Sequence, residues 1–272
     1  MDDLDLIKKK TGMTIGTAWI LMFSSMALMF LLAVVYGILG FVNKKTFSMN
    51  NSVDLVMVVM VLSFLIFALI GFFINKKELP YFAKVSPKIL LILFVIAMLW
   101  SVIASFFLDY YLNKEKMEQM EGISRTWWFA IILNTSMMIF QIGVIGHGLL
   151  RNYNLKKSMI AISFICIVFY MPAAVSSMII QSMILLYVYY RTASFLMVLY
   201  TSTLMFMPDY LYRSIFEIHQ LNYNFYKNEI FPSPAVYYVV WVLAIFALSG
   251  ALWYLKQNTK VIKWERDEES IF

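Results

Sequence analysis

The chain has 272 residues, of which 62% are hydrophobic and 14% are charged. Soluble domains carry roughly a quarter charged residues and about half apolar residues, so this composition excludes an ordinary soluble protein. The net charge of +6 comes from short basic clusters between apolar runs, which is typical of membrane topology signals rather than of nucleic-acid binding. The sequence therefore predicts an integral membrane protein with membrane lipid, and no nucleic acid, among its partners.

The first apolar run, Ile15–Val42, follows Lys8, Lys9 and Lys10. A signal peptide has an apolar core of about 7–15 residues and a cleavage site of small residues. This run is roughly twice that length and ends without such a site. We expect it to be retained as a transmembrane helix.

A helix that spans the membrane requires about 20 apolar residues. Five runs reach it: Ile15–Val42, Leu55–Ile74, Ile89–Leu108, Trp127–Leu150 and Ala235–Leu255. Interruptions at Met171–Pro172 and Tyr190–Arg191–Thr192 divide the region before the last run into three shorter pieces: Ser158–Met171, Ala173–Tyr190 and Thr192–Met207. Short helices are tolerated inside a bundle. We predict an all-α protein with about eight transmembrane helices, forming one domain over residues 1–256, and a polar cytoplasmic tail over 257–272.

Basic residues favour the cytoplasmic side of a membrane protein. With eight spans and a cytoplasmic N-terminus, 15 of the 22 lysines and arginines fall in cytoplasmic segments. A six-span arrangement also puts both ends inside, so the charge bias determines the ends and not the number of spans. We expect a multi-pass protein of the cell membrane with both termini cytoplasmic.

Two connecting segments stand out. The inner segment between the second and third spans contains Leu79–Pro80–Tyr81–Phe82 among lysines, which suits a segment at the lipid headgroup level. The outer segment Pro208–Pro234 is the longest and rich in aromatic residues. Those residues are either interfacial anchors or a surface for a partner protein, with four candidate contacts: Leu211, Tyr212, Ile215 and Phe216.

Residues that could carry chemistry are scarce. There are two histidines, His147 and His219, and one cysteine, Cys166, so we expect no metal site, no cofactor and no intrachain disulfide. None of the predicted spans has an acidic residue in its interior. Ionisable groups inside the membrane are costly and tend to be functional, so their absence argues against ion-coupled transport and against intramembrane acid–base catalysis.

The polar residues that do lie in the spans are Asn134, Gln141, His147 and Gln181. Hydrogen bonding between helices is their ordinary role. A catalytic His147 lacks a carboxylate partner in the sequence. A nucleophilic Ser202 likewise lacks an evident basic partner, so packing or backbone bonding is its expected role.

Two stretches resemble the CAAX protease and bacteriocin-processing family of eight-helix intramembrane proteases. Gly146–His147–Gly148–Leu149–Leu150 is similar to the end of that family's Glu-Glu-x-x-x-Arg-Gly-Leu-Leu motif. Tyr190–Arg191–Thr192–Ala193–Ser194–Phe195 is similar to its Arg-Thr-Gly-Ser turn. The family-like core covers about 127–207 and implies that family's fold.

The catalytic residues of the family do not carry over. The paired glutamates would correspond to Ile142 and Gly143, and the arginine to His147. The histidine of the second motif would fall near Tyr170, the last histidine at Ser202 and the asparagine near Phe206. The resemblance therefore implies the family's fold without its chemistry and leaves no catalytic residue to name.

Non-catalytic relatives of the family act as membrane partners or regulators of other proteins, including bacterial cell-wall enzymes, and some are linked to bacteriocin immunity. The resemblance implies a similar pseudoenzyme here, a scaffold or regulator of a membrane or cell-envelope protein in a bacterial plasma membrane. Two alternatives stay open. One is an active peptidase of this type, using His147 with Ser202 or a substrate-induced arrangement, or an immunity protein. The other is a permease subunit or small-substrate transporter.

Overall fold

The structure is a computed structural model that describes residues 12–42, 49–76, 78–111, 127–167, 175–216 and 231–259. Regular structure in these residues is helical, apart from an isolated antiparallel bridge between Phe82 and Ser194. The elements are α1 (Ile15–Val42), α2 (Met49–Ile74), α3 (Pro87–Tyr111), α5 (Trp127–Met138), the π-helix η3 (Ile139–Gly146), α6 (His147–Asn152), α7 (Leu155–Ile167), α8 (Val175–Thr192), α9 (Phe195–Phe216) and α11 (Pro234–Asn258). The all-α prediction is confirmed for this part of the chain.

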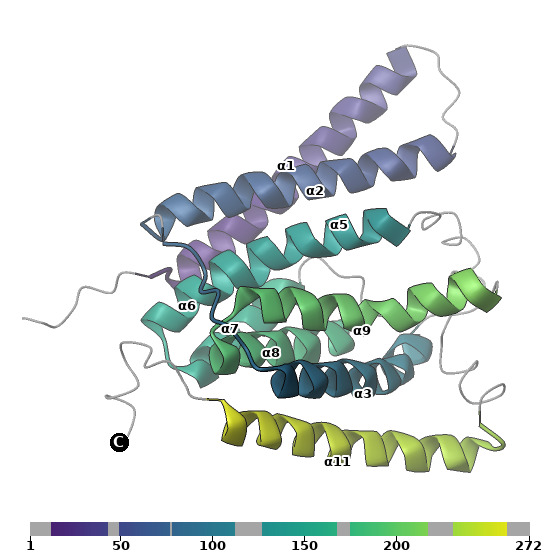
Figure 1. Ribbon diagram of the computed structural model, residues 1–272. Coiled ribbons are helices and arrows are strands. Elements are labelled where there is room, and N and C mark those ends of the chain that lie inside the picture. Colours follow the sequence, from purple (N-terminus) through teal and green to yellow (C-terminus); the bar gives the residue numbers. More distant parts are fainter. Residues whose placement is uncertain are drawn as a thin grey trace, which may run out of the picture.

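The helices lie roughly side by side in a stack (Figure 1). Successive neighbours from the purple α1 to the yellow α11 are α1, α2, α5, α9, α3 and α11, and α7 packs against α8 beside them. Because α1 and α11 lie at opposite flanks, the segment α5–η3–α6 between them is the most enclosed. Residues 140–150 are all buried.

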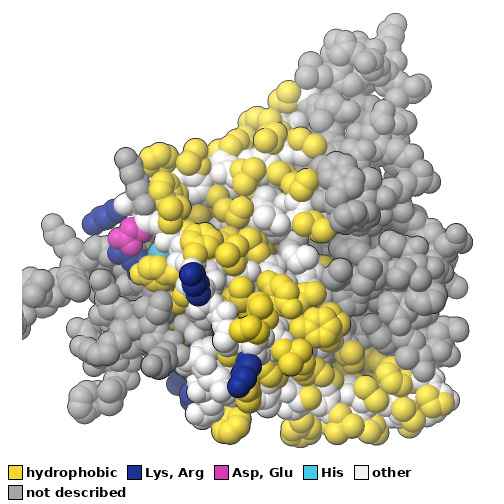
Figure 2. All heavy atoms as spheres, viewed as in Figure 1, with side chains coloured by type: hydrophobic (Ala, Val, Ile, Leu, Met, Phe, Trp, Pro, Cys, Tyr) yellow, Lys and Arg dark blue, Asp and Glu magenta, His cyan; other side chains and the backbone are white. Residues whose placement is uncertain are grey.

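The apolar surface is distributed as expected for a bundle in lipid. Four helices are long and apolar enough to cross a membrane, judged by length and composition over the described residues: Ile15–Val35, Pro87–Phe106, Ile131–Asn152 and Pro234–Asn258. Large apolar side chains on the outer faces of α1 and α11 are well exposed, for example Phe30 and Phe246. Figure 2 shows hydrophobic side chains over the middle of one face, with charged side chains gathered toward the end where α6 ends. Together these features indicate a helical membrane protein.

Both described ends of the chain lie at the same end of the bundle. The Gly12 N–H donates to Asn152 Oδ1 (3.1 Å), which ties the start of the chain to the end of α6. Arg191, near the end of α8, donates to the carbonyl of Thr259 (2.7 Å), just after α11.

An extended segment, residues 78–86, crosses this end of the bundle between α2 and α3, and we call it the strap (Figure 1). The Phe195 N–H donates to the Tyr81 carbonyl (2.8 Å), and the Ala83 N–H donates to the Ala193 carbonyl (3.0 Å). These bonds attach the strap to the turn between α8 and α9.

The run Trp127–Leu150 is helical, as predicted, with η3 as a π-helical stretch inside it. Two predicted helix bounds need correction. The segment from Pro208 is not a loop throughout, since α9 continues to Phe216; membrane helices tolerate an internal proline because neighbouring groups satisfy the freed carbonyl. Thr192 ends α8 and does not begin the next helix, because Ala193 has a φ of 47° and breaks the helical path.

Candidate functional site

The π-helix η3 is the centre of the candidate site. π-turns inside α-helices are rare and occur frequently at functional sites. Every residue from Phe140 to Gly146 is buried, and two glycines allow close neighbours. A Cβ on Gly143 would lie 3.2 Å from the Phe195 ring, and one on Gly146 would lie 2.8 Å from Leu186. Gly143 and Gly146 therefore allow η3 to lie close to α9 and α8.

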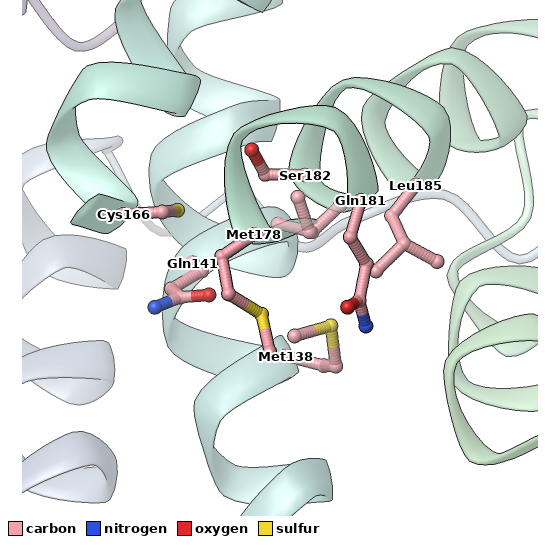
Figure 3. Close-up of a pocket in the computed structure, with 8 residues that line it drawn as sticks. Met138, Gln141, Cys166, Met178, Gln181, Ser182 and Leu185 are labelled. Carbon is pink, nitrogen blue, oxygen red and sulfur yellow. The ribbon is translucent and has the colours of Figure 1, made fainter. Parts of the chain in front are cut away.

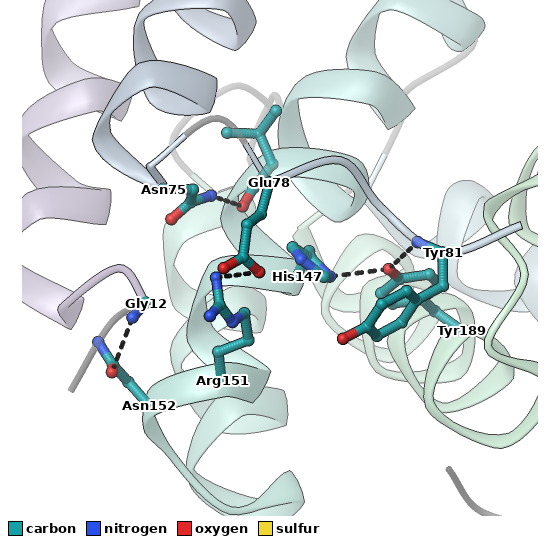
Figure 4. A network of polar contacts seen from close by, with 9 residues as sticks. Gly12, Asn75, Glu78, Tyr81, His147, Arg151, Asn152 and Tyr189 are labelled. Atoms are coloured by element: carbon teal, nitrogen blue, oxygen red, sulfur yellow. Dashed lines mark hydrogen bonds and ion pairs between the residues drawn. The ribbon is translucent and has the colours of Figure 1, made fainter. Parts of the chain in front are cut away.

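Asn75 connects the end of α2 to this π-helix. Its Nδ2 donates to the Val144 carbonyl (3.0 Å) inside the bundle (Figure 4). The same carbonyl also accepts the backbone N–H of His147 at the end of η3, so Asn75 adds a second hydrogen bond to an oxygen that has two lone pairs. Asn75 itself is 1% exposed, and its Oδ1 has no hydrogen-bond partner among the described residues.

His147 begins α6 and is fully buried. Its Nδ1 lies 2.8 Å from the Tyr189 hydroxyl, which also accepts the Tyr81 N–H (2.9 Å) (Figure 4). Because the hydroxyl oxygen accepts from the backbone, its proton can be donated to Nδ1. The Tyr81 ring packs edge-on against the imidazole, with 5.2 Å between ring centroids. His147 thus joins α6, α8 and the strap.

The charged groups nearest to His147 are paired with each other. Arg151 forms an ion pair with Glu78, the first residue of the strap (Figure 4). Arg151 is largely buried, whereas Glu78 is about half exposed. Activation of water or of a nucleophile by histidine depends on a partner aligned with the reacting group. Here the hydroxyl partner of His147 is held by the backbone of the strap, which suits a structural joint.

Ser202 lies elsewhere in the bundle. Its Oγ donates to Asn134 Oδ1 (3.0 Å) and accepts from Asn134 Nδ2 (2.6 Å), and both residues are buried. Asn134 and His147 are on the same long helical segment, so at 1.5 Å per residue they are separated by about 20 Å. The structure does not bring His147 and Ser202 together as a dyad. It confirms the predicted helix-to-helix bonding for Asn134, and His147 is buried and bonds Tyr189 of α8.

Arg191 joins the end of α8 to the end of α11, at the same end of the bundle as the strap. The Arg191 guanidinium donates to the carbonyls of Lys256 and Thr259 and to the Thr259 hydroxyl. Exposed carbonyls at a helix C-terminus carry partial negative charge, so a cation stabilises them. Arg191 is 8% exposed, and the end of α11 supplies acceptors for its buried charge.

A small pocket lies between η3, α7 and α8 (Figure 3). It has about 230 Å³ of empty volume, part of which is open to the surroundings. Its lining combines two amides, a hydroxyl, sulfur groups and aliphatic side chains: Gln141, Gln181, Ser182, Met138, Met178, Cys166, Ile142 and Leu185. Gln141 is 2% exposed and its Nε2 has no hydrogen-bond partner among the described residues. No group of three metal-ligating side chains occurs in the described residues.

The remaining predicted positions are placed as follows. Phe206 is half-buried in α9, and Tyr170 lies outside the described residues. Leu211, Tyr212, Ile215 and Phe216 lie in the last turns of α9, where the backbone alone is described. Sequence reasoning missed Asn75 and Tyr189. Asn75 had a weak signal, as a polar residue closing an apolar run, whereas Tyr189 resembles any other interfacial tyrosine.

Comparison with known protein families, curated proteins and solved structures finds no match to this chain.

Proposed function

We propose that this chain is a non-catalytic relative of the CAAX protease and bacteriocin-processing family, with eight spans and cytoplasmic ends in a bacterial plasma membrane. In this proposal it acts as a scaffold or regulator of another membrane or cell-envelope protein. The four helices with the length and composition of membrane spans support its location. The shared position of Gly12 and Thr259 at one end of the bundle supports an even number of spans.

The packing at Gly143 carries the proposal. A catalytic carboxylate at this position would need a side chain where the Phe195 ring lies 3.2 Å from the first added carbon. The preceding residue, Ile142, is 1% exposed and cannot activate water. Of the two positions that the resemblance assigns to the paired glutamates, Gly143 therefore packs η3 against α9, and Ile142 lines the pocket beside α7 and α8.

The turn at Ala193 supports the family resemblance itself. The family's Arg-Thr-Gly-Ser turn has glycine at this position, and the φ of Ala193 is 47°. Glycine adopts this left-handed region without the steric cost that Cβ imposes. The turn thus has the left-handed backbone conformation that glycine, the family's residue at this position, adopts readily. This chain has alanine there.

The partner surface is proposed at the end of α9. Leu211, Tyr212, Ile215 and Phe216 lie about 24 Å or more along the helix from Phe195, which puts them at the end of the bundle opposite the strap. Under the proposed orientation they face outside the cell. A partner with an extracellular or cell-wall domain would meet the protein there.

Affinity purification of the detergent-solubilised chain after crosslinking tests this function. We expect a stoichiometric envelope protein to co-purify and to be lost with Leu211→Glu, Ile215→Glu or Phe216→Glu. Asn154→Asp is the matched control, because it adds a negative charge at the opposite end and keeps an oxygen that accepts the Lys157 N–H. Purification of the wild-type chain alone, or equal capture by all variants, would refute the proposed surface.

A further inference from the structure

The backbone of the strap is hydrogen-bonded to the bundle. Its backbone bonds to the turn after α8 through the Tyr81 carbonyl and the Ala83 N–H, and the Tyr81 N–H donates to Tyr189. Backbone groups that are already bonded within the protein lower the cost of leaving water. The strap can therefore lie in a partly apolar environment without losing these hydrogen bonds.

Three apolar side chains of the strap are exposed. Leu79 is 65% exposed, Phe82 is 53% exposed and Tyr81 is 39% exposed. Each lies at the end of the bundle, where the ends of spanning helices meet the lipid headgroups. The Phe82 ring also packs edge-on against Phe195, with 6.2 Å between centroids, which fixes its position on the bundle.

Three exposed lysines flank these apolar side chains: Lys76 precedes the strap, Lys84 is within it and Lys88 begins α3. Glu78 is the one carboxylate in the described residues at this end, and it is paired with Arg151. Lys156, Lys157 and Lys256 add further exposed positive charge at the same end. An excess of cations around an apolar segment is complementary to anionic headgroups above acyl chains.

We propose that the strap is a binding site for anionic phospholipid. Leu79 and Phe82 insert at the boundary between headgroups and acyl chains, and Lys76, Lys84 and Lys88 bind the headgroup phosphates. This inference rests on the membrane-spanning part of the proposed function and not on the partner protein.

Thermal unfolding of the detergent-solubilised chain with added phosphatidylglycerol or phosphatidylcholine tests the site. We expect phosphatidylglycerol to raise the unfolding midpoint more than phosphatidylcholine does. The triple variant Lys76→Gln/Lys84→Gln/Lys88→Gln should lose at least half of that difference. The control Lys156→Gln/Lys157→Gln/Lys256→Gln removes the same charge at the same end and should keep most of it.

Three outcomes would overturn the site: equal effects of the two lipids on the wild-type chain, equal losses in the two triple variants, or the same stabilisation by inorganic phosphate alone. A second readout is positional. Leu79→Cys in a Cys166→Ser background carries a fluorophore whose emission we expect to be quenched by lipids labelled near the headgroup. Emission unaffected by those lipids would contradict insertion.

The lipid site and the partner surface can fail separately. If no partner co-purifies but the phosphatidylglycerol effect depends on the strap lysines, the lipid site stands and the scaffold function falls. If a partner is captured through α9 while the two lipids act alike, the scaffold function stands and the lipid site falls.

Discussion

The hydroxyl of Tyr189 lies 2.8 Å from His147 Nδ1 and 2.9 Å from the Tyr81 nitrogen. One hydroxyl thus joins the start of α6, the end of α8 and the strap. All three residues are brought to it from distant parts of the chain, and both His147 and Tyr189 are fully buried. The family resemblance assigns His147 to the position of an arginine, and here that position serves as a joint between helices.

Removing that hydroxyl should loosen the joint. Tyr189→Phe keeps the ring and removes the partner used by His147 Nδ1 and the Tyr81 N–H. Because buried groups that lose a hydrogen bond cost about 1–3 kcal/mol, we expect a loss of stability of that size in a denaturant titration. Tyr187→Phe is the control, since its hydroxyl makes no hydrogen bond in the described residues. Equal effects of the two variants would contradict the role of Tyr189.

The close approach at Gly148 should tolerate no side chain. A Cβ there would lie 2.6 Å from Asn75 Oδ1 and 2.7 Å from the Met13 Cβ. Gly148→Ala forces two elements apart, and overpacking of this kind costs about 1–3 kcal/mol. Gly250→Ala provides the comparison, because nothing lies within 4 Å of its Cβ position. Thermal unfolding should show a lower midpoint for the first variant and an unchanged or higher one for the second.

Replacing Ala193 by glycine should stabilise the protein. Its φ of 47° costs an L-residue roughly 1–2 kcal/mol. Ala193→Gly relieves this cost but adds freedom to the unfolded chain, so we expect a net gain of up to about 1 kcal/mol. Ala244→Gly, in the interior of α11, should instead lose about 1 kcal/mol. A destabilised Ala193→Gly variant would show that the turn is not strained.

Asn134 and Ser202 should be energetically coupled. Each donates one hydrogen bond to the other inside the bundle. Ser202→Ala and Asn134→Leu should each destabilise the protein, and the double variant should lose less than the sum. Contacting pairs show interaction energies of about 0.5–3 kcal/mol. Additive losses of stability in this double-mutant cycle would show that the two side chains are not coupled.

His147 should be dispensable for proteolysis. Since His147 bonds Tyr189 and lies about 20 Å along the helix from the Ser202 pair, we expect His147→Ala to leave the cleavage of membrane and envelope proteins unchanged. Comparison of their N-termini in cells with wild-type and variant protein measures this. Proteins that accumulate uncleaved only with the variant would favour the peptidase alternative, provided that both forms reach equal levels in the membrane.

The sequence by itself determined where the helices are. The run Ile15–Val42 has the same bounds as α1, and the other predicted ranges each overlap a helix of the described chain. This succeeds because apolar length is a local property, and a segment of about 20 apolar residues forms a helix in lipid wherever its neighbours lie. The bounds failed at Pro208, where the helix continues through the proline, and at Thr192, where the positive φ of Ala193 ends α8.

Only the tertiary structure decided how the candidate site is built. The π-helix at Gly143, the Asn75 bond to Val144 and the Tyr189 bond to His147 each depend on residues that are distant in sequence. The sequence pattern does not predict which buried polar groups bond to each other, because the pairing follows from how the helices pack. The residues that meet at η3, α9 and the strap were therefore visible only once the helices were packed together.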